Sequence, residues 1–279
     1  MTKIRKAVIT AASPRQRALA VQSLVDRDGE TKSALRILLE EVESSGVEEI
    51  AVVICPGDEG IYRTAAGPCG KRSVFIEQHE AKGYGHALTL ARSWVGDARC
   101  LHLVGDHLYV SREAATCAHQ LVEVATREQC AVSGVQPTRE RLLPYFGAVG
   151  GRRMPGVQNV YLVDDVVEKP TPTEAERRLV ISGLRTGHYL CFFGMHVLTP
   201  VVFEILANRL SKAEDTGALS FALAELASKE RYLAAELNGV RYDIGDRYGL
   251  WTAQLALGLT GRDREELLAR MVEMLALRG

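Results

Sequence analysis

The feature that most restricts the fold of this chain is an alternation of short apolar, often β-branched runs with longer stretches of helical periodicity. We expect strands at residues 6–10, 50–55, 73–77, 99–104, 130–135 and 164–168, and helices near 32–45, 84–95, 112–127 and 200–210. This order is typical of βαβ units, in which helices join parallel strands and cover the sheet. The sequence therefore predicts an α/β fold with a mostly parallel mixed sheet and helices on both faces.

Two segments lie outside this alternation. Glycines and alternating apolar residues at 146–163 predict a β-hairpin, or a small mixed subsheet, inserted after the main half of the chain. At 263–279 apolar residues recur at helical spacing, and this helix either packs on its own sheet, which is the simpler interpretation, or contacts a second copy of the chain. No flexible linker or repeat separates these parts, so we expect a single domain over residues 1–279.

Composition excludes several classes of function. A hydrophobic content of 47% with 25% charged residues is ordinary for a globular protein, and a net charge of -1 offers no field for nucleic acid or a membrane surface. Six cysteines without CxxC spacing predict reduced, buried thiols. The N-terminal apolar run is too short for a signal peptide, and no transmembrane stretch is present. We expect a cytoplasmic protein whose partners are small molecules, and possible self-association into a homo-oligomer stays open.

Two carboxylates follow apolar strands in a way that favours a metal site. Residues 100–104 lead into Gly105 and Asp106, and open α/β sheets present their ligands at the carboxyl ends of strands. A second acid, Asp243, stands in the segment Arg-Tyr-Asp-Ile-Gly-Asp, whose last residue, Asp246, is the better candidate for a helix cap. Two carboxylates can hold one divalent cation on a phosphate substrate. Taken alone, Asp106 is more simply a loop residue or a cap.

Two further segments carry groups suited to a nucleotide and a sugar. Gln78 can read a base edge, and the run Gly83-Tyr-Gly85-His86 precedes a helix whose backbone N–H groups could approach a ligand closely. Glu168 could accept hydrogen bonds from sugar hydroxyls while the adjacent Lys169 pairs with a phosphate. Each segment also has a plain structural interpretation, as a turn with a buried histidine and as a surface ion pair.

In their order along the chain these segments resemble the nucleoside-diphosphate-sugar pyrophosphorylases, and most closely the bacterial UTP–glucose-1-phosphate uridylyltransferases. The resemblance covers nearly the whole chain and rests on Lys6-Ala-Val-Ile-Thr-Ala-Ala12, Gln78-x4-Gly-Tyr-Gly-His-Ala87, Val104-Gly-Asp106, Phe146-Gly-Ala-Val149, Val167-Glu-Lys-Pro170, Gly194-x-His-Val-Leu-Thr-Pro200 and Arg241-Tyr-Asp-Ile-Gly-Asp246. It implies a Rossmann-like sheet of the nucleotide-diphospho-sugar transferase type.

The resemblance also implies an activity and roles for single residues. In that family a sugar 1-phosphate attacks the α-phosphorus of a nucleoside triphosphate with Mg²⁺ as cofactor, giving a nucleotide sugar and pyrophosphate; UTP and glucose 1-phosphate are the leading pair. The implied nucleotide site comprises Ala11, Ala12, Gln78, Gly83 and Gly85. The implied sugar site comprises Gly147, Glu168 and Gly194, with Lys169 on the sugar phosphate and Asp106 with Asp243 on Mg²⁺.

One segment departs from the family pattern. The Gly-rich loop after the first strand is shorter here, lacks its glycines and has no lysine between Lys6 and Lys32. Arg15 and Arg17 are the candidates to bind the triphosphate and complete the catalytic set with Asp106 and Lys169. Arg27 and Lys32 are weaker replacements, for which a solvated surface position is the simpler interpretation.

The altered loop leaves two functions open. The first is the sugar-1-phosphate nucleotidyltransferase, an enzyme of nucleotide-sugar biosynthesis. The second is a catalytically degenerate protein of the same fold that binds a nucleotide sugar or serves as a regulatory subunit. Among the histidines, His107 is expected to pack or face solvent, because Mg²⁺ prefers oxygen ligands, and His196 is expected in the core.

Overall fold

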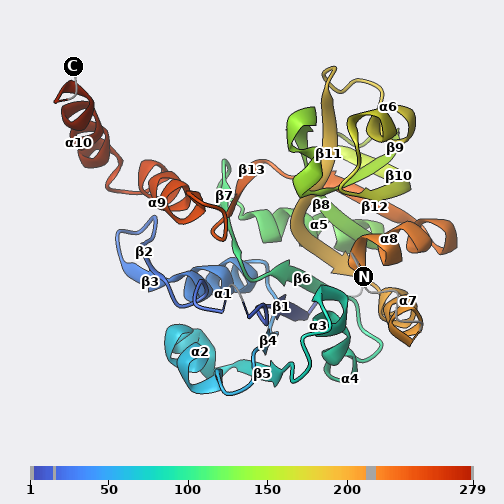
Figure 1. Ribbon diagram of the computed structural model, residues 1–279, viewed down its shortest axis with the longest axis horizontal. Helices are drawn as coiled ribbons and strands as arrows, with labels where there is room; N and C mark the ends of the chain where they lie inside the picture. The colour runs from blue at the N-terminus through green and yellow to red at the C-terminus, as the bar shows by residue number, and fades with distance from the viewer. Residues whose placement is uncertain (1–2, 15–16, 212–217, 278–279) are drawn as a thin grey trace.

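A nine-stranded sheet forms the centre of the protein (Figure 1), which we describe from a computed structural model over residues 3–14, 17–211 and 218–277. The strands are β1 (Lys6–Thr10), β2 (Ser23–Val25), β3 (Thr31–Ser33), β4 (Glu49–Ile54), β5 (Ser73–Glu77), β6 (Cys100–Val104), β7 (His107–Ser111), β8 (Ala131–Arg139), β9 (Gly147–Arg153), β10 (Val160–Glu168), β11 (His188–Leu198), β12 (Tyr232–Glu236) and β13 (Gly239–Asp243). The α-helices are α1 (Ala34–Ser44), α2 (Glu59–Ala65), α3 (Tyr84–Leu90), α4 (Arg92–Val95), α5 (Cys117–Glu128), α6 (Pro172–Arg178), α7 (Pro200–Ser211), α8 (Ala218–Lys229), α9 (Gly249–Thr260) and α10 (Arg264–Ala276).

The sheet is parallel in its first half and mixed in its second. Its strand order is β5-β4-β1-β6-β11-β8-β12-β10-β9. Strands β5, β4, β1 and β6 are parallel, whereas β11 runs antiparallel to both β6 and β8. Strand β9 pairs with β10 and again with β11, so the far end of the sheet folds back on itself. The parallel half collects its carboxyl ends, and the loops that follow them, at one edge.

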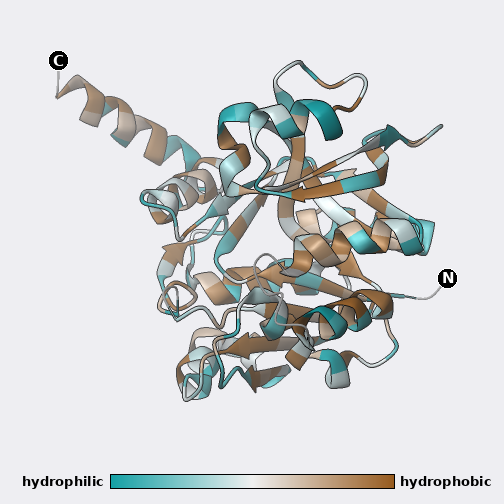
Figure 2. Cartoon of the chain, turned by 45° about the vertical axis from the view of Figure 1, so that its right-hand side comes forward, coloured by the Kyte–Doolittle hydropathy of each residue, from teal (hydrophilic) through white to brown (hydrophobic). Residues whose placement is uncertain are grey.

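Side-chain alternation divides the apolar residues between two helical layers. In β1, Ala7 and Ile9 belong to the cluster that also contains buried residues of α1, α2 and α5, whereas Val8 faces the cluster of α3, α4, α7 and α8. Such alternation is what a period of two requires of a strand covered on both sides. In Figure 2 the central strands are coloured mostly as hydrophobic, whereas the helices around them mix hydrophobic and hydrophilic residues.

The predicted parallel half agrees closely with the structure. Strands β1 and β5 have the predicted bounds, β4 is shifted by one residue, and β6 begins one residue later than predicted. The helix expected at 84–95 is two helices, because α3 ends at Leu90 and α4 begins at Arg92. The helix expected at 112–127 begins only at Cys117, where Thr116 caps it through a hydrogen bond from the N–H of His119.

The region expected to form a hairpin consists of β9 and the first part of β10, which pair antiparallel. Strand β10 continues to Glu168 through a register shift between Val163 and Asp165, so it also includes the separate strand expected at 164–168. This places Glu168 opposite Gly147 at the end of the hairpin.

The C-terminal helix α10 does not pack on the sheet, contrary to the simpler interpretation of its apolar spacing. None of its residues is buried, and it extends from α9 away from the rest of the protein (Figures 1 and 2). Leu267 packs against α9 so closely that a Cβ on Gly258 would clash with its side chain. Val272, Met274 and Leu275 are exposed.

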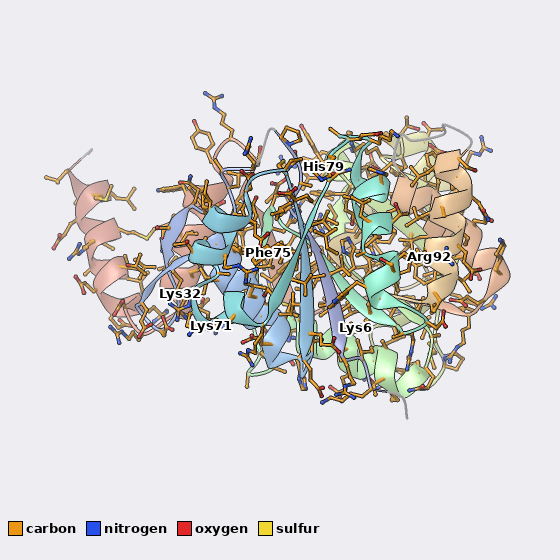
Figure 3. All side chains as sticks on the ribbon, turned by 90° about the horizontal axis from the view of Figure 1, so that it is seen from below. Lys6, Lys32, Lys71, Phe75, His79 and Arg92 are labelled. Carbon is orange, nitrogen blue, oxygen red and sulfur yellow. The ribbon has the colours of Figure 1, made fainter. Side chains whose placement is uncertain are left out.

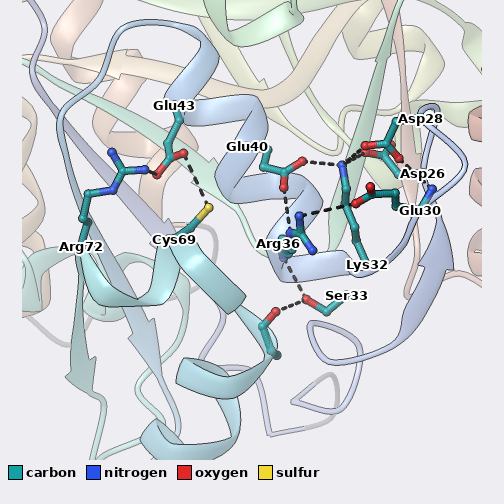
Figure 4. Close-up of polar contacts among 11 residues, drawn as sticks. Asp26, Asp28, Glu30, Lys32, Ser33, Arg36, Glu40, Glu43, Cys69 and Arg72 are labelled. Atoms are coloured by element: carbon teal, nitrogen blue, oxygen red, sulfur yellow. Dashed lines mark hydrogen bonds and ion pairs between the residues drawn. The ribbon is translucent and has the colours of Figure 1, made fainter.

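The hairpin of β2 and β3 contains a buried lysine rather than a surface one. Lys32 Nζ lies 2.7 Å from Asp26, 2.5 Å from Asp28 and 2.7 Å from Glu40 of α1, and its side chain is 4% exposed (Figures 3 and 4). Burial lowers the pKa of Lys32, but these hydrogen bonds outweigh burial and raise it. Lys32 therefore joins the hairpin to α1 and is not a replacement phosphate ligand. Arg27 is exposed at the hairpin turn, as expected.

The cysteines are in the state that the sequence predicts. All six cysteines are buried and free. In the part of the chain that the structure describes, no helix combines the length and the apolar character needed to cross a membrane.

Candidate functional site

The site lies where β1, β5 and β6 end. In Figure 3 the labelled His79, two residues beyond β5, lies at the opposite end of the parallel strands from Lys6, the first residue of β1. The ends of β1 and β6 touch at Gly105, whose N–H donates to Thr10 O at 2.8 Å. A Cβ on Gly105 would lie 2.8 Å from that oxygen and from Ala11 Cβ. Only glycine permits this approach, which carries Asp106 to the loop after β1.

The first cavity, of about 400 Å³, lies between that loop and α3. It is lined by Thr10, Ala12, Ser13, Pro14, Gln78, Ala81, Gly83, Tyr84, Ala87, Val104 and Asp106. The structure thus brings three of the predicted nucleotide residues, Ala12, Gln78 and Gly83, to one cavity. Ala11 and Gly85 do not line it, because Ala11 is held behind it by its N–H bond to Val53 O and Gly85 is buried within α3.

Gln78 is fixed by the turn that precedes α3. Its Nε2 donates to Gly83 O at 3.2 Å and lies 2.9 Å from His86 Nδ1. Gly83 has φ 93°, a left-handed conformation that favours glycine. The turn is structural, as one interpretation has it, although His86 is only partly buried, and it holds the Gln78 amide at the wall of the cavity.

The second cavity, of about 240 Å³, adjoins the first. It is lined by Tyr84, Val104, Asp106, His107, Tyr145, Phe146, Gly147, Glu168, Phe192, Gly194, His196, Leu219 and Ser220. All three residues predicted for the sugar, Gly147, Glu168 and Gly194, are among them. Tyr84, Val104 and Asp106 line both cavities, so Asp106 lies at their common wall.

The position of Glu168 depends on a glycine and a serine. A Cβ on Gly147 would lie 2.9 Å from Glu168 Oε2 and 2.7 Å from the Phe192 ring, so the carboxylate occupies space that only glycine leaves open. Ser220 Oγ of α8 donates to the same Oε2 at 2.5 Å. Ser220 therefore fixes one oxygen of the carboxylate. A carboxylate fixed in this way is positioned in advance to orient a ligand that carries hydroxyl groups.

Gly194 forms a similar close contact on β11. It has φ 83° and lies where the pairing of β11 with β8 shifts register. Its carbonyl accepts a hydrogen bond from Tyr109 Oη at 2.9 Å, and a Cβ would lie 3.0 Å from both Tyr109 Oη and Val104. The irregularity of β11 lets β7 approach the sheet at the second cavity.

The ribbon of β7 and β13 brings the two acids together. Its register sets Asp243 opposite His107, the residue after Asp106. Ligand atoms of Asp106, His107 and Asp243 lie within 4.8 Å of one another, and His107 Nδ1 is 2.7 Å from Asp106 Oδ1. His107 packs, as one of the two expected alternatives has it, since its ring stacks on Tyr109, and its Nδ1 also lies beside the acids. Two carboxylates at this spacing fit a divalent cation.

Asp246 does not cap α9, which begins at Gly249 after Tyr248. The Asp246 side chain instead accepts the N–H of Arg247, within the turn that leads from β13 to α9. The hydrogen bond from Gly245 N–H to Asp243 Oδ1, at 2.8 Å, fixes the carboxylate of Asp243 in the same turn. The segment therefore orients Asp243 through its backbone.

A chain of buried polar groups supports the wall that both cavities share. Tyr84 Oη lies 2.5 Å from His102 Nε2, and His102 Nδ1 donates to Val8 O at 2.9 Å. The ring of His102 stacks with that of His196, in the core as expected, with centroids 6.1 Å apart. Burial lowers the pKa of His102 to about 4 and that of His196 to about 3, so both are neutral near pH 7. Neither histidine carries charge into the site.

Of the cations predicted for the phosphates, Arg17 and Lys169 line neither cavity. Arg17 forms an ion pair with Asp58 in which its Nε donates at 2.9 Å, and Arg15 lies outside the described residues. Lys169 has φ 48° and an exposed side chain whose Nζ is 3.9 Å from Glu168. Among the described residues, neither cavity is lined by an arginine or a lysine.

One further cation is buried beside the second cavity. The Arg241 guanidinium lies 3.8 Å from the centroid of the Phe146 ring, its Nη1 donates to Phe192 O, and its Nη2 has no hydrogen-bond partner in the described part of the chain. Burial lowers the pKa of Arg241 to about 10, which still leaves it charged at pH 7. It adds positive potential where an anionic ligand would enter.

Thr10, Tyr84 and Ser220 line the cavities but were given no role from the sequence. Thr10 ends β1, and its Oγ1 is buried at the wall of the first cavity without a hydrogen-bond partner among the described residues. Tyr84 could have been found, since it stands between the two glycines of the predicted turn. Ser220 carries no signal, because it belongs to a helix far along the chain whose approach to Glu168 is a matter of tertiary packing.

Comparisons with known proteins agree with this arrangement. No family model matches the chain. The UTP–glucose-1-phosphate uridylyltransferase YngB of Bacillus subtilis is 29% identical to it, over 98% of this chain and 96% of that protein. A UTP–glucose-1-phosphate uridylyltransferase of Streptococcus pyogenes is 28% identical over 93% and 90%. The solved UDP-glucose pyrophosphorylase of Acinetobacter baumannii has a TM-score of 0.78 at 21% identity and covers 98% of this chain, which supports the fold.

Proposed function

We propose, since this chain belongs to the nucleoside-diphosphate-sugar pyrophosphorylase family, that it transfers the uridylyl group of UTP to glucose 1-phosphate, giving UDP-glucose and pyrophosphate. The observation that carries the proposal is the pair of adjoining cavities with Asp106 on their common wall. The first holds the predicted nucleotide residues and the second the predicted sugar residues. A reaction that joins a nucleotide to a sugar phosphate needs its two substrates to meet at one point.

The transfer requires no covalent nucleophile on the protein. A phosphate oxygen of the sugar 1-phosphate forms a bond to the α-phosphorus of the triphosphate, the bond from that phosphorus to its bridging oxygen breaks, and the bridging oxygen leaves with pyrophosphate. The attacking oxygen is already anionic, so no base has to remove a proton. The protein accelerates the step by orientation and by offsetting the charge of two polyanions.

Each cavity offers groups for orientation. In the first, the Gln78 amide is fixed by Gly83 and His86 and can pair with the edge of a base. In the second, Glu168 is held by Ser220 and accepts hydrogen bonds from sugar hydroxyls. Lys169 stands next to Glu168, and its flexible ammonium reaches the sugar phosphate.

We propose a divalent cation, Mg²⁺ in the simplest case, at Asp106 and Asp243. Their ligand atoms lie within 4.8 Å of each other, and carboxylate oxygens suit a hard cation. When bound, such an ion neutralises phosphate charge and orients the reacting groups. This contribution carries particular weight here, because neither cavity has a lysine or arginine in its lining among the described residues.

The same scarcity of cations favours a second candidate function. A protein of this fold that binds a nucleotide sugar without making one would keep both cavities and dispense with the phosphate-binding loop. The loss of one preorganised donor costs about 3–4 kcal/mol of transition-state stabilisation. The two metal-binding acids favour the enzyme, since a sensor has less need of both.

The deciding experiment measures pyrophosphate release by the purified protein with Mg²⁺, each nucleoside triphosphate and a panel of sugar 1-phosphates. We expect turnover that is greatest with UTP and glucose 1-phosphate and that disappears in Asp106→Asn and in Asp243→Asn. Asp246→Asn is the matched control, because Asp246 lies three residues from Asp243 on an exposed turn and lines neither cavity. Tight calorimetric binding of UDP-glucose with no turnover for any pair would establish the sensor instead.

A further inference from the structure

A histidine nitrogen lies beside the two acids of the metal site that the proposed function requires. Antiparallel register sets His107 of β7 directly opposite Asp243 of β13, and residues directly opposite each other project from the same face of a ribbon. Asp106 precedes His107 at the tight turn after Gly105. The three side chains therefore converge, and their ligand atoms lie within 4.8 Å of one another.

The geometry between His107 and Asp106 suits a shared ion. His107 Nδ1 is 2.7 Å from Asp106 Oδ1. Neighbouring ligands of an octahedral ion, each at about 2.1 Å from it, are about 3 Å apart, so both atoms can bind one ion with little movement. Without an ion this contact is a hydrogen bond, and a metal ion would take the place of the shared proton.

The His107 ring is held in place on the side away from the acids. It stacks on Tyr109 with centroids 6.4 Å apart, and Tyr109 is in turn fixed by its hydrogen bond to Gly194 O. The side chains of His107 and Asp106 are 14% and 24% exposed, so they face the second cavity without lying free on the surface. Ligand groups ordered in advance bind an ion with a smaller entropic cost.

We propose that His107 is the third protein ligand of the ion held by Asp106 and Asp243, and that its nitrogen makes the site select a first-row divalent transition ion, such as Mn²⁺, over Mg²⁺. The chemistry follows from ligand type. Mg²⁺ prefers an all-oxygen shell, whereas imidazole nitrogen binds transition ions well. The inference rests on the proposed function only for the metal site, since it concerns which ion is bound and not whether the protein catalyses.

The first test is spectroscopic and uses the unmodified full-length protein with Mn²⁺ and no nucleotide. Electron spin echo modulation reports a nitrogen that is directly bound to Mn²⁺. We expect that modulation in the wild-type protein and its loss in His107→Asn. The wild-type spectrum alone decides the matter if the variant fails to fold, and a spectrum without a bound nitrogen overturns the proposal.

The second test compares affinities. Free Mn²⁺ is followed by its paramagnetic resonance, and Mg²⁺ is measured by competition. We expect His107→Asn to weaken Mn²⁺ binding about tenfold or more, with a change in Mg²⁺ binding of less than about threefold. Asparagine retains an N–H donor near Asp106, so a histidine that only orients this carboxylate would be rescued by the substitution. Equal effects on the two ions, or none, overturn the proposal.

His119→Asn serves as the matched control, because His119 is exposed on α5 and belongs to no metal-binding group. The outcome is separable from that of the proposed function. A protein that binds Mn²⁺ through nitrogen but shows no turnover keeps this inference and loses the enzyme. A protein that turns over with Mg²⁺ but shows no bound nitrogen keeps the enzyme and loses this inference.

Discussion

The buried pair His102 and His196 makes the stability of the protein sensitive to acid. Burial lowers their pKa values to about 4 and about 3, from the ordinary value of 6.5. The positive charge of a protonated His102 lowers the pKa of His196 further. Both rings are stacked between sheet strands, with their nitrogens engaged by Val8 O, Tyr84 and Ser133. Protonation of either ring therefore requires the core to open.

The sign and size of the effect follow from linkage. Between the folded and unfolded pKa values the folded state binds fewer protons, so the stabilising contribution is complete above about pH 6.5 and is lost as the pH falls. At about pH 5 each histidine removes about 2 kcal/mol from the free energy of unfolding. Domains of this kind have about 5–15 kcal/mol in total, so the loss is a large fraction.

Glu41 acts in the opposite direction over the same range. Burial raises its pKa to about 7, against the hydrogen bond that its carboxylate accepts from Ala118 N–H at 2.8 Å. A carboxyl group whose pKa is raised stabilises the fold below its unfolded value near 4.5, and this stabilisation is lost as the pH rises through 7. It is worth about 2 kcal/mol at about pH 5, so it offsets one of the two histidines.

Urea unfolding of wild type, His196→Asn and Glu41→Gln between about pH 7.5 and about pH 5 separates these contributions. Compared with wild type, we expect His196→Asn to lose about 2 kcal/mol less on acidification and Glu41→Gln to lose about 2 kcal/mol more. His119→Asn, on an exposed helix face, should follow wild type. Parallel pH profiles for wild type and His196→Asn would refute the reasoning, because they would mean that His196 titrates alike in the folded and unfolded states.

Three further outcomes test the site and the C-terminal helix. Ser220→Ala frees Oε2 of Glu168 and should raise KM for glucose 1-phosphate several-fold with little change in KM for UTP, as steady-state kinetics would reveal; an equal rise in both would refute this role. Arg241→Met removes a buried charge that forms no ion pair among the described residues. It should change stability in urea by less than about 2 kcal/mol and weaken calorimetric UDP-glucose binding; unchanged affinity would exclude the charge from binding. Deletion of 264–277 should shift Tm by less than about 4 °C, since no residue of α10 is buried and Leu267 makes its close contact with α9, and a larger shift would show that α10 is covered in solution.

The parallel half of the fold was predictable because each of its strands carries its own signal. β1 is an apolar run buried between two helical layers, β5 is the β-branched and aromatic run at the edge of the sheet, and the bounds of both follow from the sequence alone. The β7–β13 ribbon has no such signal. Its two strands lie more than a hundred residues apart and pair because of how the whole chain folds. Patterns of local residues carry little information about such contacts.

In the candidate site, too, the residues with a local sequence signal were predicted, and those that depend on long-range pairing were not. Asp106, Gln78 and Glu168 were recognised because each ends a strand and belongs to a motif, and all three line the cavities. His107 packs on Tyr109, as expected, but its position opposite Asp243 could not be predicted, because it depends on the register of β7 with β13. The surface position expected for Lys32 was wrong, because a lysine that three carboxylates surround has the same local sequence as a solvated one.

The loop after β1 shows why the metal site matters so much in this chain. The described cation of this loop is Arg17, whose side chain is 51% exposed. Its ion-pair partner, Asp58, has a side chain that is only 5% exposed. Withdrawing Arg17 would leave that carboxylate buried and unpaired, which is unfavourable. Tyr62 fixes the same loop by donating a hydrogen bond to Ala11 O or Arg17 O. Because Arg17 is paired with Asp58, the proposed function assigns the neutralisation of phosphate charge chiefly to the ion proposed at Asp106 and to Lys169.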